Sequence, residues 1–235
     1  MRATPGRTAA VIALASLAPF ALSSLVAAHG VTSRDARFLQ SIDGAAVMPL
    51  MYLGAKHMVT GYDHLLFLAG VVFFLYRPAH ILLYVSLFTL GHSVTLLAGA
   101  LGGLRVNPYL IDAIIGLSIV YKGFENIGGF PRLIGCQPDT RIAVLVFGLF
   151  HGLGLATKLQ DLQLSRNGLV TNILSFNAGV EIGQMLALAA VLLLLVAWRR
   201  HASYLRHALA LNSALMAGGF TLIGYQLTGF FIGAR

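Results

Sequence analysis

The chain has 235 residues, of which 57% are hydrophobic and only 10% are charged, and its formal net charge is +8. A soluble domain usually carries about 25% charged residues, so this composition excludes a water-soluble fold and indicates an integral membrane protein. In such a protein the basic residues are expected in short loops beside anionic lipid. The positive charge is thereby explained, and nucleic acid is not an expected partner. The single cysteine, Cys136, excludes an internal disulfide and a cysteine-rich metal site.

Residues 1–28 have the pattern of a secretory signal peptide. Two arginines precede the apolar run AAVIALASLAPFALSSLV, and small residues end it in VAAHG. Cleavage after Ala28 would make His29 the first mature residue; the alternative is an uncleaved transmembrane helix. The pattern predicts export to or across a bacterial-type inner membrane, with a short exported segment over residues 29–44.

Six apolar segments follow, each near the roughly 20 residues that a helix needs to cross a bilayer. The alternation typical of a β-barrel strand is not seen, so we predict an all-α polytopic membrane bundle of about six transmembrane helices over residues 45–232. The first segment is long enough to be broken, and Gly61 is the expected break. The predicted spans are 45–75, 80–103, 108–128, 141–157, 168–198 and 207–232.

Charged loop residues orient this bundle. If the mature N-terminus lies outside, the cytoplasmic loops hold six basic residues and the outside loops hold three, while Arg34, Arg37 and Lys56 near the N-terminus also fall outside. The positive-inside rule then predicts an inner-membrane protein with its mature N-terminus and its C-terminus both outside. The inside residues are Arg77, Arg132, Arg141, Arg199, Arg200 and Arg206, and the outside residues are Arg105, Lys158 and Arg166.

Ionisable residues inside the predicted spans are functional candidates, because each costs roughly 2.5–3.5 kcal/mol at the membrane centre. Three of them occur together in KHMVTGYDHLL: His57, Asp63 and His64. On a continuous helix the two histidines would lie about two turns apart, so both could reach one ion only if the helix broke between them, at Gly61. Asp63 is a candidate ligand or an orienting partner for an imidazole; a polar cap on a helix N-terminus is the alternative.

Two further histidines lie in mid-span. His92 occurs in FTLGHSVTLL together with Thr89 and Ser93. Hydroxyls in membrane helices often bond their own i−4 carbonyl, so those two residues have a structural interpretation as well. His151 lies in FGLFHGLGLA, whose glycines would leave room for a neighbouring helix or an ion.

A polar stripe marks the fifth predicted span, in SFNAGVEIGQ, and a stripe that contains a carboxylate is expected to line a pathway or a site. Its members are Asn177, Glu181 and Gln184. Lys122 and Glu125 are expected to pair as i, i+3 neighbours near the cytoplasmic face. Asp112 is expected to cap the start of its helix.

Imidazole and carboxylate ligands without a thiolate suit borderline divalent ions such as Ni²⁺, Co²⁺, Zn²⁺ and Cu²⁺, whereas Mg²⁺ and Ca²⁺ prefer all-oxygen sites. The sequence has no H-E-x-x-H zincin pattern, P-loop or dinucleotide fingerprint, and nothing in it indicates ATP coupling. The predicted metal residues are His57, Asp63, His64, His92, His151 and Glu181. The predicted lining or supporting residues are Asn177, Gln184, Ser93 and Thr89.

The segment HMVTGYDHLLFL resembles the opening motif of the HupE/UreJ family of bacterial membrane proteins, in particular its second branch. His57, Gly61, Asp63 and His64 carry the resemblance. The segments FTLGHS, FGLFHGLG and NAGVEIGQ are also similar to that branch, so the resemblance spans roughly residues 45–232. It implies transport of nickel, and sometimes cobalt, next to hydrogenase and urease systems.

These patterns leave three functional hypotheses. In a metal permease, the 57–64 motif would receive nickel or cobalt near the outer face, and the other predicted residues would carry the ion through the bundle. In an intramembrane zinc hydrolase, the same residues would converge on one ion that keeps an open position. A metal-handling assembly factor, with Cu²⁺ held by the free amine of His29, is the third. The expected partners are the lipid bilayer and the metal ion, a homo-oligomer is left open, and the enzyme is less favoured than the permease.

Overall fold

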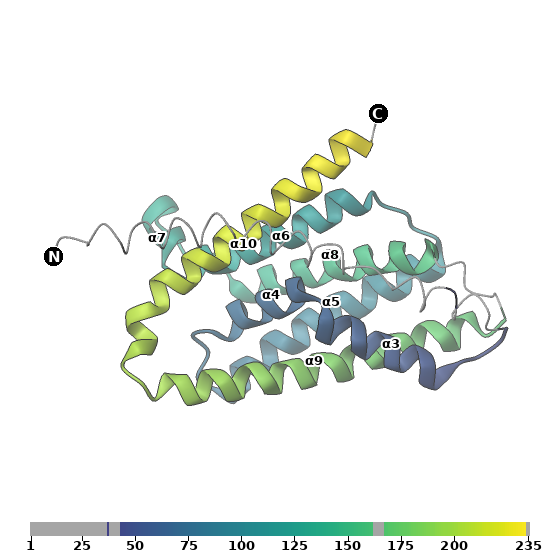
Figure 1. Cartoon of the computed structure of the whole chain (residues 1–235), viewed down its shortest axis with the longest axis horizontal. Helices are drawn as coiled ribbons and strands as arrows, with labels where there is room; N and C mark the ends of the chain where they lie inside the picture. Colours follow the sequence, from purple (N-terminus) through teal and green to yellow (C-terminus); the bar gives the residue numbers. More distant parts are fainter. Residues whose placement is uncertain (1–36, 38–42, 162–166, 234–235) are drawn as a thin grey trace.

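The computed structural model describes residue 37 and residues 43–161 and 167–233. In those ranges every regular element is a helix (Figure 1), which confirms the predicted all-α fold. The helices are α3 (Val47–Thr60), α4 (Tyr62–Val72), α5 (Pro78–Gly102), α6 (Pro108–Asn126), α7 (Gly129–Ile134), α8 (Thr140–Asp161), α9 (Leu169–Arg199) and α10 (Ser203–Gly233). The predicted signal peptide lies outside the described residues.

Four of these helices, α5, α8, α9 and α10, are long and apolar enough to cross a membrane, so the chain is a membrane protein. Helices α3 and α4 have 14 and 11 residues, and each alone is too short to cross. Helix α6 has 19 residues but includes an aspartate, a lysine and a glutamate. Length and composition therefore give four candidate spans in the described ranges, where the sequence predicts six.

The helix break predicted at Gly61 is confirmed, but its physical reason differs from the expected one. Helix α3 ends at Thr60 and α4 begins at Tyr62, and Gly61 between them has φ −72° and ψ 98°. Side chains tolerate this negative φ, so backbone freedom is not what requires glycine. A Cβ at position 61 would lie 2.7 Å from Nδ1 of His64 and 3.1 Å from Oδ1 of Asp63. Glycine is needed for the space beside these two side chains.

Glycines hold the helices in three close pairs: α5 with α8, α3 with α9, and α6 with α10. A Cβ on Gly152 of α8 would lie 2.0 Å from the carbonyl oxygen of His92 in α5. A Cβ on Gly179 of α9 would lie 1.9 Å from the carbonyl oxygen of Met51 in α3. Inside a membrane, van der Waals contact at this range is a main source of helix association. The packing role expected for the glycines is confirmed at these positions.

The two short helices α3 and α4 are anchored to α9 at their far ends. The side chain of Asn172 accepts from the backbone N–H of Ala46 at 2.8 Å and donates to the carbonyl of Gly44 at 2.9 Å, next to the start of α3. At the end of α4, where a helix leaves carbonyls unsatisfied, the guanidinium of Arg199 donates to three carbonyl oxygens at 2.5, 2.7 and 2.9 Å. These anchors leave the α3–α4 junction in the middle of the bundle.

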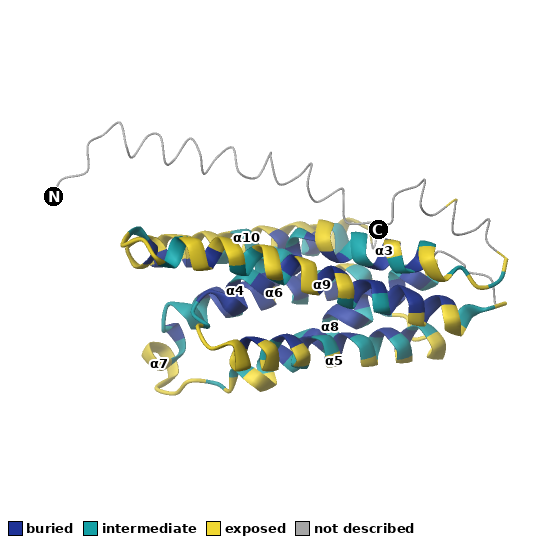
Figure 2. Ribbon diagram, turned by 90° about the horizontal axis from the view of Figure 1, so that it is seen from below, coloured by how far each residue is buried: buried dark blue, intermediate teal, exposed yellow. Residues whose placement is uncertain are grey.

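The bundle has two ends, which we name by residue. The Asp112 end holds the starts of α3, α6 and α9 and the ends of α5, α8 and α10, at the right in Figure 1; the Arg199 end is opposite. In the most apolar 18-residue stretch of each helix, 50% of α8 is buried but only 11% of α10. Helix α8 is therefore central and α10 peripheral, as the colouring of Figure 2 shows.

A buried histidine cluster as the candidate functional site

Four histidines from four helices meet at the α3–α4 junction. The ring centroid of His64 in α4 lies 5.2 Å from that of His57 in α3, 6.4 Å from that of His92 in α5 and 5.0 Å from that of His151 in α8. We call these four residues the histidine cluster. The break at Gly61 brings His57 beside His64, as the sequence interpretation requires. Of the four, His64, His92 and His151 are buried and His57 is partly exposed.

Asp63 fixes the ring of His64. Its Oδ1 accepts from the backbone N–H of His64 at 2.8 Å and lies 2.8 Å from Nδ1 of the same residue. An ionised carboxylate can only accept, so this pairing places the imidazole proton on Nδ1 and leaves the lone pair of Nε2 bare. Asp63 also lies in the first turn of α4, where negative charge is favoured. It therefore fills both roles that the sequence suggests, orienting an imidazole and stabilising a helix N-terminus.

Ser118 of α6 fixes the position of the proton on the ring of His151. Its hydroxyl donates to the carbonyl of Ile115 at 2.6 Å, so at 3.4 Å from Nε2 of His151 it is left to accept. The proton of His151 then belongs on Nε2, and the lone pair of Nδ1 is bare. Ser118 is fully buried in an apolar helix, and the sequence gives no sign that it faces a histidine of another helix.

Three imidazole nitrogens of the cluster are buried without a hydrogen-bond partner among the described residues: Nε2 of His64, Nε2 of His92 and Nδ1 of His151. Such orphans are rare in native proteins, and each costs about 1–3 kcal/mol. Three of them on adjoining rings point to a ligand that binds nitrogen lone pairs. A borderline divalent metal ion has that chemistry.

Two small cavities flank His64, each of about 10 Å³, which is room for about one water molecule. The first lies toward the Asp112 end, and its charged or polar lining residues are His57, Asp63, His64, Asp112, His151 and Lys158. The second lies toward the Arg199 end and is mostly apolar, with Tyr84 and Gln184 among its lining residues. His64 lines both of these cavities.

The rings of His57, His92 and His151 surround that of His64. Among the residues that the structure describes, no group of three or more histidine, cysteine, aspartate or glutamate side chains is placed to hold a metal ion. A catalytic Zn²⁺ needs three protein ligands at about 2.0–2.2 Å, so the convergence expected of an intramembrane hydrolase is not observed.

Glu181 lies on the face of α9 that meets α5. Its Oε1 accepts from Nδ2 of Asn177 at 3.1 Å and from the hydroxyl of Ser93 at 3.4 Å. Ser93 directly follows His92 in the chain, so the carboxylate is linked to the helix that carries this member of the cluster. The predicted polar stripe of α9 therefore faces the bundle interior.

The remaining predicted polar residues have mainly structural contacts. Thr89 donates to its own i−4 carbonyl at Val85 at 2.9 Å, as its structural interpretation predicts. Gln184 donates to the same carbonyl from α9 at 3.4 Å while lining the second cavity. Lys122 and Glu125 form the expected i, i+3 ion pair, near the Arg199 end.

Asp112 and Lys158 differ from their predicted roles. The side chain of Asn107 caps α6 by accepting from the N–H of Tyr109 at 3.0 Å, whereas Asp112 pairs with Lys158. Lys158 was expected in an outside loop after residue 157, but α8 continues to Asp161 and includes it. It follows His151 by seven residues, which is two turns along one helix face, and that spacing is the signal in the sequence that places it near the cluster.

Gly61→Ala is expected to damage the site without unfolding the protein. The new Cβ would press on Nδ1 of His64 and Oδ1 of Asp63, while the backbone angles suit alanine. Loss of a partner that orients a metal-binding imidazole typically costs 10–100-fold in affinity, and we expect about 10-fold weaker Ni²⁺ binding in calorimetry of the purified protein. Thr60→Ala, next in the chain and exposed, is the control that should bind like the native protein. Native affinity in Gly61→Ala would show that the space at position 61 does not serve the histidines.

The fold and the cluster together define a polytopic helical membrane protein with imidazoles and carboxylates along its interior. Residues 33–234 match the HupE / UreJ protein family, and the chain belongs to that family. The resemblance carried by the 57–64 motif is thereby confirmed, with the second branch as the matching one. No curated protein and no solved structure matches the chain.

Proposed function

We propose that this protein is a secondary permease for a divalent transition-metal ion, with Ni²⁺ or Co²⁺ as substrate. The observation that carries the proposal is the set of three buried imidazole nitrogens without partners, on three helices around one junction. Neutral imidazole is a common ligand for such ions. The association of the HupE/UreJ family with nickel and cobalt transport and with urease and hydrogenase maturation supports the choice of metal.

The ion would enter the first cavity from the Asp112 end, pass His64 and leave through the second cavity beside Gln184. Conduction requires sites that bind weakly enough to release the ion, which suits rings that do not form one tight shell. Transporters often place such sites where a helix is interrupted near the bilayer midplane, as α3 and α4 are at Gly61. Imidazoles can also take up a proton as the ion leaves, so proton coupling fits this route.

In the membrane, α3 and α4 together would make one crossing and α6 another, so that six segments span the bilayer. The Asp112 end would face outside and the Arg199 end would face the cytoplasm of a bacterial cell. The positive-inside count supports this orientation.

Asp63→Asn is expected to lower metal uptake about 10-fold or more at unchanged protein level, since outer partners of ligating histidines contribute 10–100-fold in affinity. An amide can donate to Nδ1 of His64 and so favours the wrong tautomer. The measurement is accumulation of Ni²⁺ and Co²⁺ by cells that lack other uptake systems for these ions. Asp161→Asn, at an acid whose side chain is 56% exposed, is the matched control and should keep native uptake. Equal uptake by the two variants would count against a role for Asp63.

Glu181→Gln separates a pathway from a single binding site. Glutamine keeps an acceptor for Asn177 and Ser93 but removes the charge, so we expect uptake to slow by about 5-fold, the equivalent of the roughly 1 kcal/mol that one charged contact contributes. Metal bound per purified protein should stay native, because the histidine cluster is intact. If the variant lost metal binding altogether, Glu181 would be a ligand of the same site as the histidines and not a separate site further along the path of the ion.

A further inference from the structure

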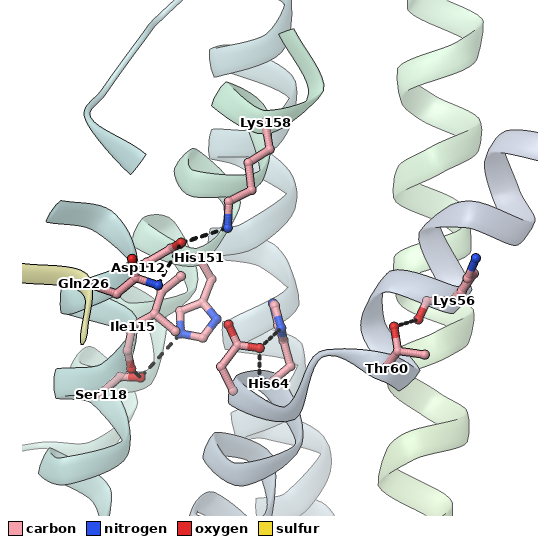
Figure 3. Close-up of polar contacts among 10 residues, drawn as sticks. Lys56, Thr60, His64, Asp112, Ile115, Ser118, His151, Lys158 and Gln226 are labelled. Atoms are coloured by element: carbon pink, nitrogen blue, oxygen red, sulfur yellow. Dashed lines mark hydrogen bonds and ion pairs between the residues drawn. The ribbon is translucent and has the colours of Figure 1, made fainter. Parts of the chain in front are cut away.

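An ion pair closes the first cavity at the Asp112 end. Nζ of Lys158 lies 3.0 Å from both carboxylate oxygens of Asp112, and Nε2 of Gln226 reaches Oδ2 at 3.5 Å. Figure 3 shows this group above His151 and His64. Helices α6, α8 and α10 thus meet on one carboxylate, and its pair with Lys158 lines the same cavity as three members of the histidine cluster.

The pair lies between the accessible end of the bundle and the buried cluster. The side chains of Lys158 and Asp112 are 27% and 14% exposed, whereas those of Asp63 and His64 are 8% and 4% exposed. An ion that approaches the first cavity from this end therefore meets the pair before it reaches the buried ring of His64.

The ammonium of Lys158 occupies both oxygens that Asp112 could offer to a metal ion. Carboxylate oxygen is a suitable ligand for divalent transition metals, and an ammonium is a compact cation on a flexible stem. Lys158 thus stands where an incoming cation would bind. Its flexible stem and its 27% exposed side chain allow the ammonium to swing toward water.

We infer that Asp112 is the outermost cation ligand of the permease and that Lys158 is its built-in competitor. A divalent cation reaches the histidine cluster only by displacing the ammonium from Asp112. A monovalent cation has no advantage in charge over the tethered ammonium, so the pair also selects for divalent ions. The inference rests on the proposed function, because it assigns the entrance of that same route.

The entrance is tested without metal by a cysteine reporter. In a Cys136→Ser background, which removes the single native thiol, Ile115→Cys places a thiol on the wall of the first cavity. Ag⁺, a thiol-binding cation about the size of the one water molecule that the cavity holds, is added from outside. With the native pair labelling is expected to be slow, and with Lys158→Met about 5-fold faster, the rate equivalent of the roughly 1 kcal/mol that one charged contact contributes. The exchange Asp112→Lys with Lys158→Asp restores the pair and should restore slow labelling.

Two controls keep this test decisive. Leu104→Cys, exposed in the loop at the same end, should react at one rate in every background. Leu155→Cys, on the α8 side of the cavity, replaces the first reporter if Ile115→Cys fails to accumulate. Fast labelling with the native pair, or no labelling after Lys158→Met, would overturn the assignment of the entrance.

Competition is tested by uptake. Lys158→Met should lower the Ni²⁺ concentration that gives half-maximal uptake by about 5-fold, and Asp112→Asn should raise it by about as much. An unchanged value in both variants would overturn the role of Asp112 as a ligand. Absence of uptake by the native protein would instead contradict the permease itself, while the labelling result would still decide whether the pair closes the cavity.

Discussion

Replacement of His64 by alanine is expected to abolish metal binding at the cluster and to reduce uptake to the level of cells without the protein. His64 is the residue whose ring adjoins those of His57, His92 and His151, and it lines both of the small cavities beside it. Removing a partner that only orients a ligand costs 10–100-fold, so losing the central imidazole should weaken Ni²⁺ binding by at least about 100-fold. Metal binding and uptake are both lost with this one side chain, because His64 belongs to the histidine cluster and lies on the proposed path of the ion.

The measurement combines elemental analysis of the purified protein with cellular uptake. His80→Ala is the matched control, because His80 is exposed at the start of α5, at the Arg199 end. A native thermal unfolding profile for His64→Ala would show that the loss is not a folding defect. If His64→Ala had the same metal content as the native protein, the histidine cluster would not be the metal site.

Gly152→Ala is expected to have the largest effect on stability, even though it adds a single methyl group. The new Cβ would lie 2.0 Å from the carbonyl oxygen of His92 and 2.4 Å from the hydroxyl of Thr95. A backbone carbonyl cannot turn away as a side chain can, so α5 and α8 must separate. Overpacking of this kind costs typically 1–3 kcal/mol, and for a protein of this size 3 kcal/mol corresponds to a fall in Tm of roughly 6–12 °C.

The separation would also pull His92 away from His151, so uptake should fall together with Tm. Gly224→Ala is the control: Gly224 lies in α10, and no atom is within 4 Å of where its Cβ would be. There alanine is expected to leave stability native or to raise it, since glycine is about 0.5–1 kcal/mol worse than alanine inside a helix. A Gly152→Ala protein with native Tm and uptake would contradict the close packing of α5 and α8.

Much of the fold can be predicted from the sequence, because apolar length and turn residues are local signals. The break at Gly61 could also be predicted, since His57 and His64 cannot share an ion on an unbroken helix. The pairing of the helices could not be predicted. Every predicted span carries small residues, and the sequence does not show which two helix backbones pack closely through them. That pairing is what places His92 beside His151.

The same limit applies to the residues that support the site. Ser118 and Asp112 lie on α6, and their partners His151 and Lys158 lie on α8, so nothing in the local sequence of either helix reveals the contact. Asp112 was assigned to a cap because a carboxylate near a helix start usually has that role. Its actual partner is found only once α6 and α8 are side by side.

The central claim is that a divalent transition-metal ion crosses the membrane through the histidine cluster. The most direct test is flux of Ni²⁺ or Co²⁺ into proteoliposomes that contain the purified protein and a metal-sensitive dye. We predict saturable influx with the native protein, and influx no greater than that of empty liposomes with His64→Ala. Native proteoliposomes that fill no faster than empty ones, under a metal gradient with and without a proton gradient, would contradict the claim.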